Sequence, residues 1–302
     1  MKRTVSKMGN SSLVMSLPHV WVKENNVTMG DELNVEPMEK GLLVSLTNIR
    51  YKEKTLRVDV SALSNRTILN ILNSAYRLGY LTVIITFKDA GQLSYITETV
   101  RERFLGFEVV EEKGNVCIIQ NVAEPSADKI EIILRKVFLL TRQSFEFIIK
   151  DAHDKKFVHF DQLENTKKTV DSFTNFVRRT ILLTQQGGKD GSYFLWSIVG
   201  YLSLVFHALY YFYKEMSELK NGRGEASSIL TSLEKMYGLL YDCFYSFSYE
   251  MINEIDELRQ DVFRSFSSQR SVLPFFYLFE CAREIQMTSS FFSGYHLREW
   301  RS

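Results

Sequence analysis

The sequence has few of the residues that build disulfide frameworks or loop-rich folds. Its 302 residues include 3 cysteines and 4 prolines. Cys117, Cys243 and Cys281 are far apart and form no Cys-x-x-Cys pair, which argues against both a disulfide set and a zinc site and indicates a reducing compartment. The scarcity of proline, together with 22 Phe and 15 Tyr, favours long helices packed through aromatic side chains.

The sequence also lacks the local signatures of enzyme active sites. It contains no Gly-x-Gly-x-x-Gly motif or phosphate-binding loop in its α/β segment, and no Ser-His-Asp or Cys-His arrangement of recognisable spacing. Its 5 histidines share no metal-ligand spacing. We therefore predict that the protein is not an enzyme and has no catalytic residues, no cofactor and no metal site.

No charge of either sign dominates. The formal net charge is +1, with 45% hydrophobic and 24% charged residues, as in an ordinary globular protein of two or three domains. A surface for nucleic acid must therefore be local. The apolar run at residues 13–17 is too short for the core of a secretory signal, so we predict a cytoplasmic protein.

The first 46 residues form a segment of their own. Gly9, Gly30 and Gly41 divide short apolar runs, a pattern that predicts strand, turn, strand, short helix, turn, strand, turn and strand. Such a segment is too small to bury a core by itself. We therefore predict that it pairs with a second copy, which makes the protein a homodimer.

Basic residues gather at the start of this segment. Lys2, Arg3 and Lys7 precede residue 8, and residues 1–23 contain no acid. Two copies would double this charge, which is enough to contact DNA phosphates, and Asn10 and Ser11 can donate hydrogen bonds to phosphates or base edges. We predict these five as DNA-binding residues. The alternative is a solvated terminus and an asparagine that supports its turn.

Residues 47–123 alternate between strand and helix patterns. The expected elements are a strand at 56–60, a helix at 64–78 capped by Ser64, a strand at 81–87, a helix at 94–104 and a hairpin of strands 107–110 and 116–119. This β-α-β-α-β-β order predicts a small α/β domain. We interpret it as a structural connector; a small-molecule sensor pocket is the alternative.

From residue 124 the pattern becomes helical to the end. Helices are expected near 130–148, 160–185, 193–219 and 274–297, with one or two more in 225–266, divided near Phe247. They form either two consecutive three-helix bundles or one long array. The predicted fold class is thus multidomain α+β, with domains at 1–46, 47–123 and 124–302.

The N-terminal segment resembles the swapped-hairpin domain of the AbrB, MazE and SpoVT proteins. The matching pieces are KMGNSSLVMSLP at 7–18, Trp21-Val22, the GDEL turn at 30–33 and the LLVSL strand at 42–46. The resemblance covers residues 1–46. It implies an interleaved homodimer that often binds DNA through basic residues near its N-terminus.

The helical half resembles the PhoU family, whose chains carry two three-helix bundles in tandem. The similarity lies in VDSF at 170–173 followed by VRR at 177–179, and in EIDEL at 254–258. A swapped-hairpin domain fused to PhoU-like helices looks like an archaeal regulator of phosphate uptake. Where the family places a metal-binding acid, this chain has Lys167 before Asp171 and Ile252 before Asp256. We therefore predict that both aspartates cap a helix, pair with cations or are solvated.

A second group of potential metal ligands lies between two expected helices. It consists of Asp151, His153, Asp154, His159 and Asp161. These residue types can ligate a metal, but interhelix loops are commonly polar and nothing in the spacing fixes a coordination geometry. We interpret them as hydrogen-bonded surface groups.

Residues Tyr193 to Tyr213 contain no Asp, Glu, Lys or Arg. Length and composition fit a membrane span, and equally a helix at the centre of a bundle. The tyrosines and His207 favour the bundle, so we predict a core helix, a core histidine and no integral membrane span. A docking surface for a transporter or membrane is the alternative.

These features support three functional hypotheses. The first is a dimeric transcriptional regulator of phosphate uptake that binds DNA through Lys2, Arg3, Lys7, Asn10 and Ser11. The second is an adaptor that only dimerises through its N-terminal segment and contacts a phosphate transporter or a sensor kinase through its helices. The third is a membrane-anchored regulator that uses Tyr193 to Tyr213.

Overall fold

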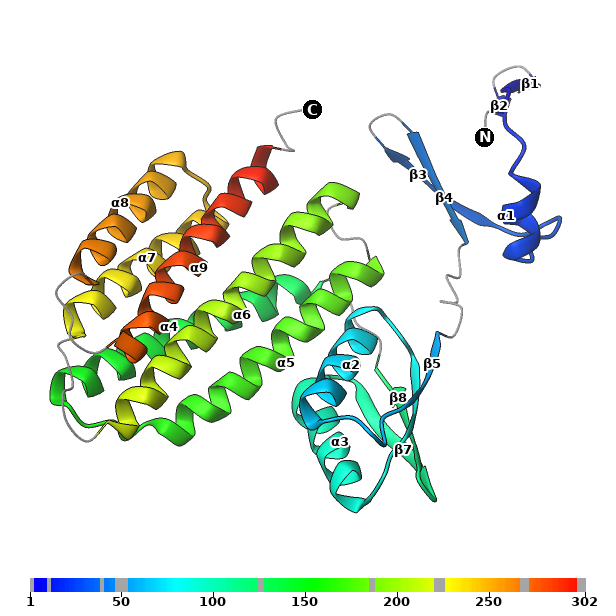
Figure 1. Ribbon diagram of the computed structural model, residues 1–302. Helices are drawn as coiled ribbons and strands as arrows, with labels where there is room; N and C mark the ends of the chain where they lie inside the picture. Colours follow the sequence, from blue (N-terminus) through cyan, green and yellow to red (C-terminus); the bar gives the residue numbers. More distant parts are fainter. Residues whose placement is uncertain are drawn as a thin grey trace. The chain divides into compact units, whose positions relative to one another are not determined.

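The chain forms two units in the computed structural model, an N-terminal unit of Met1–Lys52 and a C-terminal unit of Glu53–Ser302 (Figure 1). The structure describes residues 3–9, 12–38, 41–46, 54–123, 128–184, 188–219, 226–266 and 272–297. The fold is mixed α+β and mostly helical, which confirms the predicted class at this level.

The N-terminal unit is built of two hairpins and a short helix. Strand β1 (Ser6–Met8) pairs antiparallel with β2 (Ser12–Val14), helix α1 (His19–Glu24) follows Pro18, and β3 (Leu33–Met38) pairs antiparallel with β4 (Gly41–Leu46). Gly9 and Gly30 have positive φ angles of 70° and 98°. Residues with a Cβ atom rarely adopt such backbone conformations, so glycine is favoured at both turns. The order of elements is the one predicted from the glycine-divided pattern.

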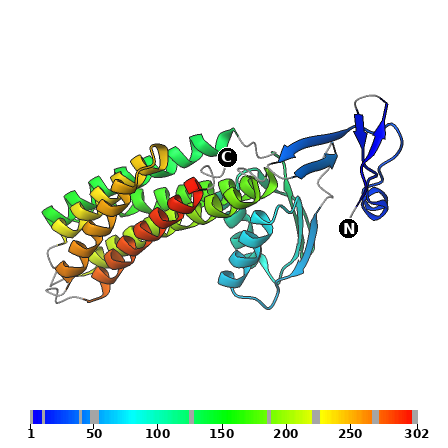
Figure 2. The ribbon, with the colours of Figure 1, turned by 90° about the horizontal axis from the view of Figure 1, so that it is seen from above.

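The C-terminal unit begins with an α/β segment at residues 54–123. Its elements are β5 (Thr55–Asp59), α2 (Asn65–Arg77), β6 (Thr82–Thr86), α3 (Ala90–Arg103), β7 (Phe107–Lys113) and β8 (Val116–Asn121). The predicted β-α-β-α-β-β order is confirmed. The strands lie in the order β5-β6-β8-β7, with only β5 and β6 parallel, and α2 and α3 cover one face of the sheet (Figures 1 and 2).

Local caps set the ends of these helices. The Ser64 hydroxyl accepts a hydrogen bond from the Thr67 amide at 3.3 Å, as the predicted cap requires. Helix α3 begins at Ala90, so its predicted start at Ser94 was wrong. The Asp89 carboxylate accepts a hydrogen bond from the Gln92 amide at 2.9 Å and caps the helix one turn earlier.

The helical segment follows at residues 128–297. Its helices are α4 (Lys129–Asp154), α5 (Phe160–Thr184), α6 (Gly188–Glu218), α7 (Ser227–Tyr245), α8 (Tyr249–Phe266) and α9 (Val272–Leu297). The region at 225–266 holds two helices, and they divide at Ser246 to Ser248, as the break near Phe247 predicted.

The helices pack side by side around a shared core. Helices α4, α5 and α6 contact one another, as do α7, α8 and α9, and the two sets meet where α6 runs along α9 and α4 lies on α7 (Figure 2). One continuous cluster of buried side chains passes through both sets. Two three-helix groups are therefore present, but they do not have separate cores.

Helix α6 lies at the centre of this packing. In the described part of the chain, its stretch Gly191–Glu218 is the one helix that length and composition would allow to cross a membrane, and 50% of its most apolar window is buried. Leu202, Val205 and Phe206 have no exposed surface. This packing agrees with the prediction that Tyr193 to Tyr213 is a core helix.

The shared core provides a first test of the fold. Phe145 of α4 is 0% exposed and its ring centroid lies 5.8 Å from that of Tyr237. We expect Phe145→Ala to lower the free energy of unfolding by about 3–5 kcal/mol, since it removes buried apolar surface and leaves a cavity. The control Ile132→Ala, on the same helix and 63% exposed, should change it by less than about 0.5 kcal/mol. Urea unfolding measures both, and equal losses would contradict the assigned core.

Candidate functional site

The predicted DNA-binding residues lie at the β1–β2 hairpin. Lys2, Asn10 and Ser11 fall outside the described residues. Arg3 and Lys7 are both exposed. Lys7 stands opposite Leu13 across the hairpin, so the two side chains share one face.

A further cation of this unit was not singled out from the sequence. Lys23 lies exposed in the last turn of α1. Lys23 belongs to the acid-free stretch 1–23, which could have indicated it as a further basic residue of this surface. It was not selected because it lies far from Lys7 in the sequence. Arg3, Lys7 and Lys23 are all exposed, and no Asp or Glu occurs in residues 1–23. The beginning of this unit is therefore basic.

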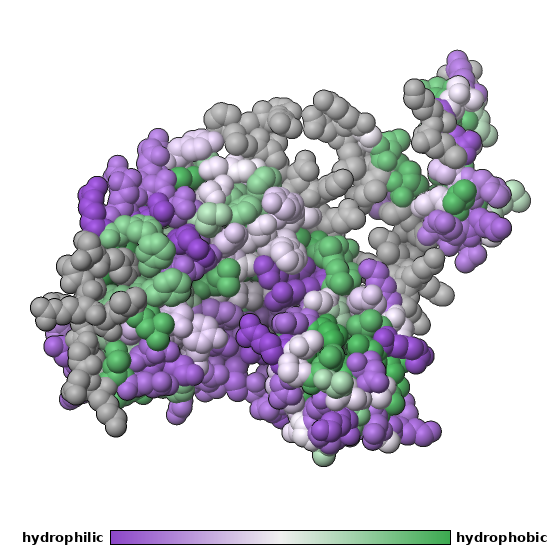
Figure 3. Space-filling model, in the orientation of Figure 1, coloured by the Kyte–Doolittle hydropathy of each residue, from purple (hydrophilic) through white to green (hydrophobic). Residues whose placement is uncertain are grey.

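The apolar side chains of the N-terminal unit lack a core. Wherever exposure is described in this unit, no residue is buried. Leu33 and Val35 of β3 share a face with Leu42 and Val44 of β4, yet Val35 is 50% and Leu42 62% exposed. Leu13 of β2 is 73% exposed. Figure 3 shows apolar residues on the surface of this unit. A two-stranded ribbon with an uncovered apolar face is at best marginally stable in water.

A second site joins the α/β segment to the helices. We call it the polar seam, and it consists of Asn73, Tyr76 and Arg77 of α2, Glu102 and Arg103 of α3, Lys167, Lys168, Asp171, Asn175, Arg178 and Arg179 of α5, and His207 of α6.

Asp171 is the centre of the polar seam. Its carboxylate is buried and contacts three basic side chains: Arg103 Nη1 at 2.8 Å, Lys167 Nζ at 3.4 Å and His207 Nε2 at 2.6 Å. Burial by itself raises the pKa of the Asp171 carboxyl. The hydrogen bond and charge of His207 and the charges of Lys167 and Arg103 outweigh burial and lower the pKa from 3.8 to about 2. Asp171 is therefore ionised at neutral pH.

Neighbouring contacts continue the polar seam along α5. Lys168 Nζ lies 2.8 Å from Glu102 Oε1, and Asn175 Nδ2 donates to Asn73 Oδ1 at 3.2 Å. Arg179, which is fully buried, donates from Nη1 to the Tyr76 carbonyl at 2.6 Å. These bonds tie α2 and α3 to α5, so the α/β segment and the helices form one body.

The two aspartates of the PhoU-like signatures have different environments. Asp171 pairs with cations, one of the predicted roles. Asp256 of α8 is half-buried and forms no hydrogen bond or ion pair within the described residues. His207 was predicted as a core histidine; its side chain is 28% exposed and contacts Asp171 instead, because α6 turns this face toward α5.

The predicted loop cluster divides into two parts. Asp151, interpreted as a surface group, is buried, because its carboxylate accepts hydrogen bonds from the Val158 amide at 3.0 Å, from His159 Nδ1 at 2.9 Å and from the Tyr213 hydroxyl. These bonds lower the pKa of Asp151 against the opposing effect of burial. His153 pairs instead with Asp154 on the surface.

The geometry of these groups bears on metal binding. Within the described part of the chain, no three or more His, Cys, Asp or Glu side chains are arranged to hold a metal ion. The three cysteines are free and buried, in three different elements. Burial raises the pKa of the Cys117 thiol to about 11, which keeps it in the unreactive thiol form.

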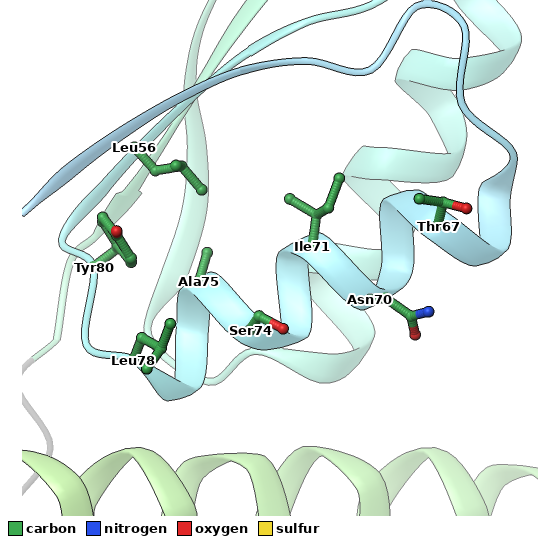
Figure 4. Close-up of a pocket in the computed structure, with 8 residues that line it drawn as sticks. All are labelled: Leu56, Thr67, Asn70, Ile71, Ser74, Ala75, Leu78 and Tyr80. Atoms are coloured by element: carbon green, nitrogen blue, oxygen red, sulfur yellow. The ribbon is translucent and has the colours of Figure 1, made fainter.

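A shallow groove lies on the other side of α2, between this helix and strand β5 (Figure 4). Its volume is about 320 Å³, and Leu56, Ile71, Ala75 and Leu78 are among the residues that line it. No charged side chain lines it. Ligand sites usually combine apolar walls with convergent polar groups, so the groove offers little to fix a polar small molecule.

No family model, curated protein or solved structure matches the chain. Function is therefore inferred from the residues and geometry described above, together with the two resemblances in the sequence.

The Asp171 network makes a prediction about pH. Because folding lowers the pKa of Asp171, its ionised form stabilises the fold above the unfolded pKa of about 4, and this stabilisation is lost as the pH falls toward 2. Asp171→Asn should therefore lower the free energy of unfolding by about 2 kcal/mol at pH 7, and the difference from the natural protein should shrink below pH 4.

The control for this experiment is Asp256→Asn, which removes a carboxylate on α8 that forms no ion pair with any described residue. It should leave the stability nearly unchanged across the same pH range. Urea unfolding at a series of pH values measures both variants. A difference for Asp171→Asn that does not vary between pH 7 and pH 3 would contradict the assigned ion pairs.

Proposed function

We propose that the protein is a dimeric DNA-binding regulator of transcription, acting in the control of phosphate uptake. The observation that carries the proposal is the N-terminal unit, which combines an uncovered apolar face with an acid-free, basic beginning. The resemblance to swapped-hairpin domains and PhoU-like helices supplies the biological context.

The apolar face supports the dimer. Val35, Leu42 and Val44 share one side of the β3–β4 ribbon, and Val35 and Leu42 remain largely in water. Each such side chain contributes about 1.5–3 kcal/mol when it is fully buried. The same face on a second copy offers matching apolar surface in the same small unit, and a symmetric pair would cover both faces at once.

The cations support DNA binding. Arg3 and Lys7 are exposed, and a dimer places each of them twice on one assembly. Each phosphate contact releases counterions, so affinity for DNA falls steeply with salt. The net charge of the whole chain is +1, so this attraction is confined to the basic beginning of the unit.

The C-terminal unit would act as the regulatory part. Its α/β segment and helices form one body through the polar seam, so a change at the helices would reach the sheet through these contacts. A phosphate transporter or sensor kinase is the partner that the PhoU resemblance suggests. An adaptor without DNA binding is the competing function.

The dimer can be tested by placing a charge on the proposed interface. Leu42→Asp should convert the dimer to monomer, because two carboxylates would be buried on an apolar face. Val110→Asp is the matched control, since Val110 is 47% exposed in the C-terminal unit. Sedimentation velocity measures the mass of each. A natural protein that is monomeric at micromolar concentration would refute the proposed dimer.

DNA binding can be tested by removing the predicted cations. Replacing Lys2, Arg3 and Lys7 by Ala should abolish binding to genomic fragments in mobility-shift titrations and reduce the salt dependence by about 0.9 log units per lost phosphate contact. A variant with Arg66, Lys113 and Lys150 changed to Ala removes three exposed cations of the C-terminal unit and should bind normally.

Two results would contradict DNA binding. One is the absence of salt-dependent binding by the natural protein, and the other is unchanged affinity in the Lys2/Arg3/Lys7 variant. Recovery of membrane transporter subunits in a pull-down, with no DNA enriched by chromatin precipitation, would establish the adaptor instead.

A further inference from the structure

The cations of the polar seam outnumber its carboxylates, and most of them have an assigned partner. Arg103 and Lys167 contact Asp171, and Lys168 contacts Glu102. Arg179 donates to a backbone carbonyl deep in the fold. Arg77 and Arg178 form no ion pair with a carboxylate in the described part of the chain, and each donates to an uncharged oxygen through Nε alone.

Arg178 is held by α6 in a fixed place. Its guanidinium lies 4.0 Å from the centroid of the Trp196 ring, and its Nε donates to the Trp196 carbonyl at 3.4 Å. A Cβ atom on Gly200 would come within 1.7 Å of Arg178 Nη2. The absence of a side chain at Gly200 therefore leaves room for the guanidinium group of Arg178. The terminal nitrogens of Arg178 form no hydrogen bond within the described residues.

Arg77 is held on the neighbouring helix. The Nε atom of Arg77 donates a hydrogen bond to Oδ1 of the buried Asn175 at 2.8 Å. Asn175 lies on α5, one turn before Arg178. Its terminal nitrogens form no hydrogen bond within the described part of the chain. Burial, together with the nearby positive charge of Arg77, lowers the pKa of Arg178 to about 9. Asn175 and Arg178 are three residues apart on α5 and share one face of this helix, so two partly buried guanidinium groups approach the same face of α5.

We propose that Arg77 and Arg178 form a binding site for a small tetrahedral oxyanion of the phosphate or sulfate type. Guanidinium groups bind such anions through paired, charge-assisted hydrogen bonds, and an anion between them would replace their mutual repulsion with attraction. The proposal is independent of DNA binding, since all of its residues belong to the C-terminal unit.

The site would link two layers of the fold. Arg77 comes from α2 of the α/β segment, whereas Arg178 comes from α5 and rests on α6. A bound anion would therefore fasten the sheet layer to the helices, beside the contacts of Asp171. Because the anion would bind the folded protein alone, it would raise the stability of the C-terminal unit with increasing concentration.

The test is a calorimetric titration of the full chain with inorganic phosphate, and separately with sulfate, at constant ionic strength set by chloride. The natural protein should bind one anion per chain. Arg77→Gln and Arg178→Gln should each weaken the affinity at least about tenfold, the loss expected when one charged hydrogen-bond donor group is removed. Arg66→Gln, an exposed arginine on the same helix as Arg77, should bind as the natural protein does.

A further variant tests the placement of Arg178 without removing its charge. Gly200→Ala puts a methyl group where Arg178 Nη2 lies, so it should also weaken binding. Circular dichroism establishes that each variant is folded; if Arg178→Gln does not fold, Arg77→Gln and Gly200→Ala decide the question. Binding of phosphate or sulfate that depends on these residues supports the site. No heat beyond the chloride control, or equal affinity in Arg77→Gln and Arg66→Gln, overturns it.

Discussion

The buried carboxylate of Asp171 is the interaction on which the C-terminal unit depends. It receives basic groups from α3, from its own helix α5 and from α6, through Arg103, Lys167 and His207. A single buried charge would be costly, and its removal from a satisfied network leaves several cations without compensation. Asp171 therefore connects the sheet layer to the helical core. Its ion pairs explain why this contact region is polar, although burial alone would favour apolar contacts there.

The two units meet the requirement for a core in opposite ways. The C-terminal unit has one cluster under the sheet and another through the helices, both made of fully buried side chains. In the N-terminal unit, Leu13, Val35 and Leu42 are each at least half exposed. An isolated two-stranded ribbon gains little stability from its own contacts. The proposed dimer would supply the missing core of the first unit, whereas the second unit has its own core within one chain.

The sequence predicted the elements well where periodicity and caps determine them. Gly9 and Gly30 marked the N-terminal turns, Ser64 marked the start of α2, and the helical pattern of the second half marked the helices from α4 to α9. The sheet order was not predictable, because the placing of β8 between β6 and β7 depends on contacts remote in the chain. Dimerisation, DNA binding and a role in phosphate uptake remain predictions.

The polar seam could not be found from the sequence for the same reason. Asp171 was recognised through its signature, but Arg103 and His207 lie 68 and 36 residues away from it in the chain. No local pattern links residues at such separations. Asp151 was misjudged as a surface group because the sequence around it is polar, but it lies in the last turns of α4, and the tyrosine that bonds to it comes from α6.

Helix α6 shows why an apolar helix at the centre of a bundle still needs polar side chains. A helix that is apolar on all sides can rotate about its axis with little change in buried area, so hydrophobic burial does not fix its orientation. His207, Tyr210 and Tyr213 each meet a carboxylate, on Asp171, Glu164 and Asp151 respectively. Any rotation of α6 would break these bonds in a poorly solvated environment, where an unpaired polar group is costly. The same orientation places Gly200 against Arg178. The polar contacts of His207, Tyr210 and Tyr213 therefore also help to fix the position of the Arg178 guanidinium group.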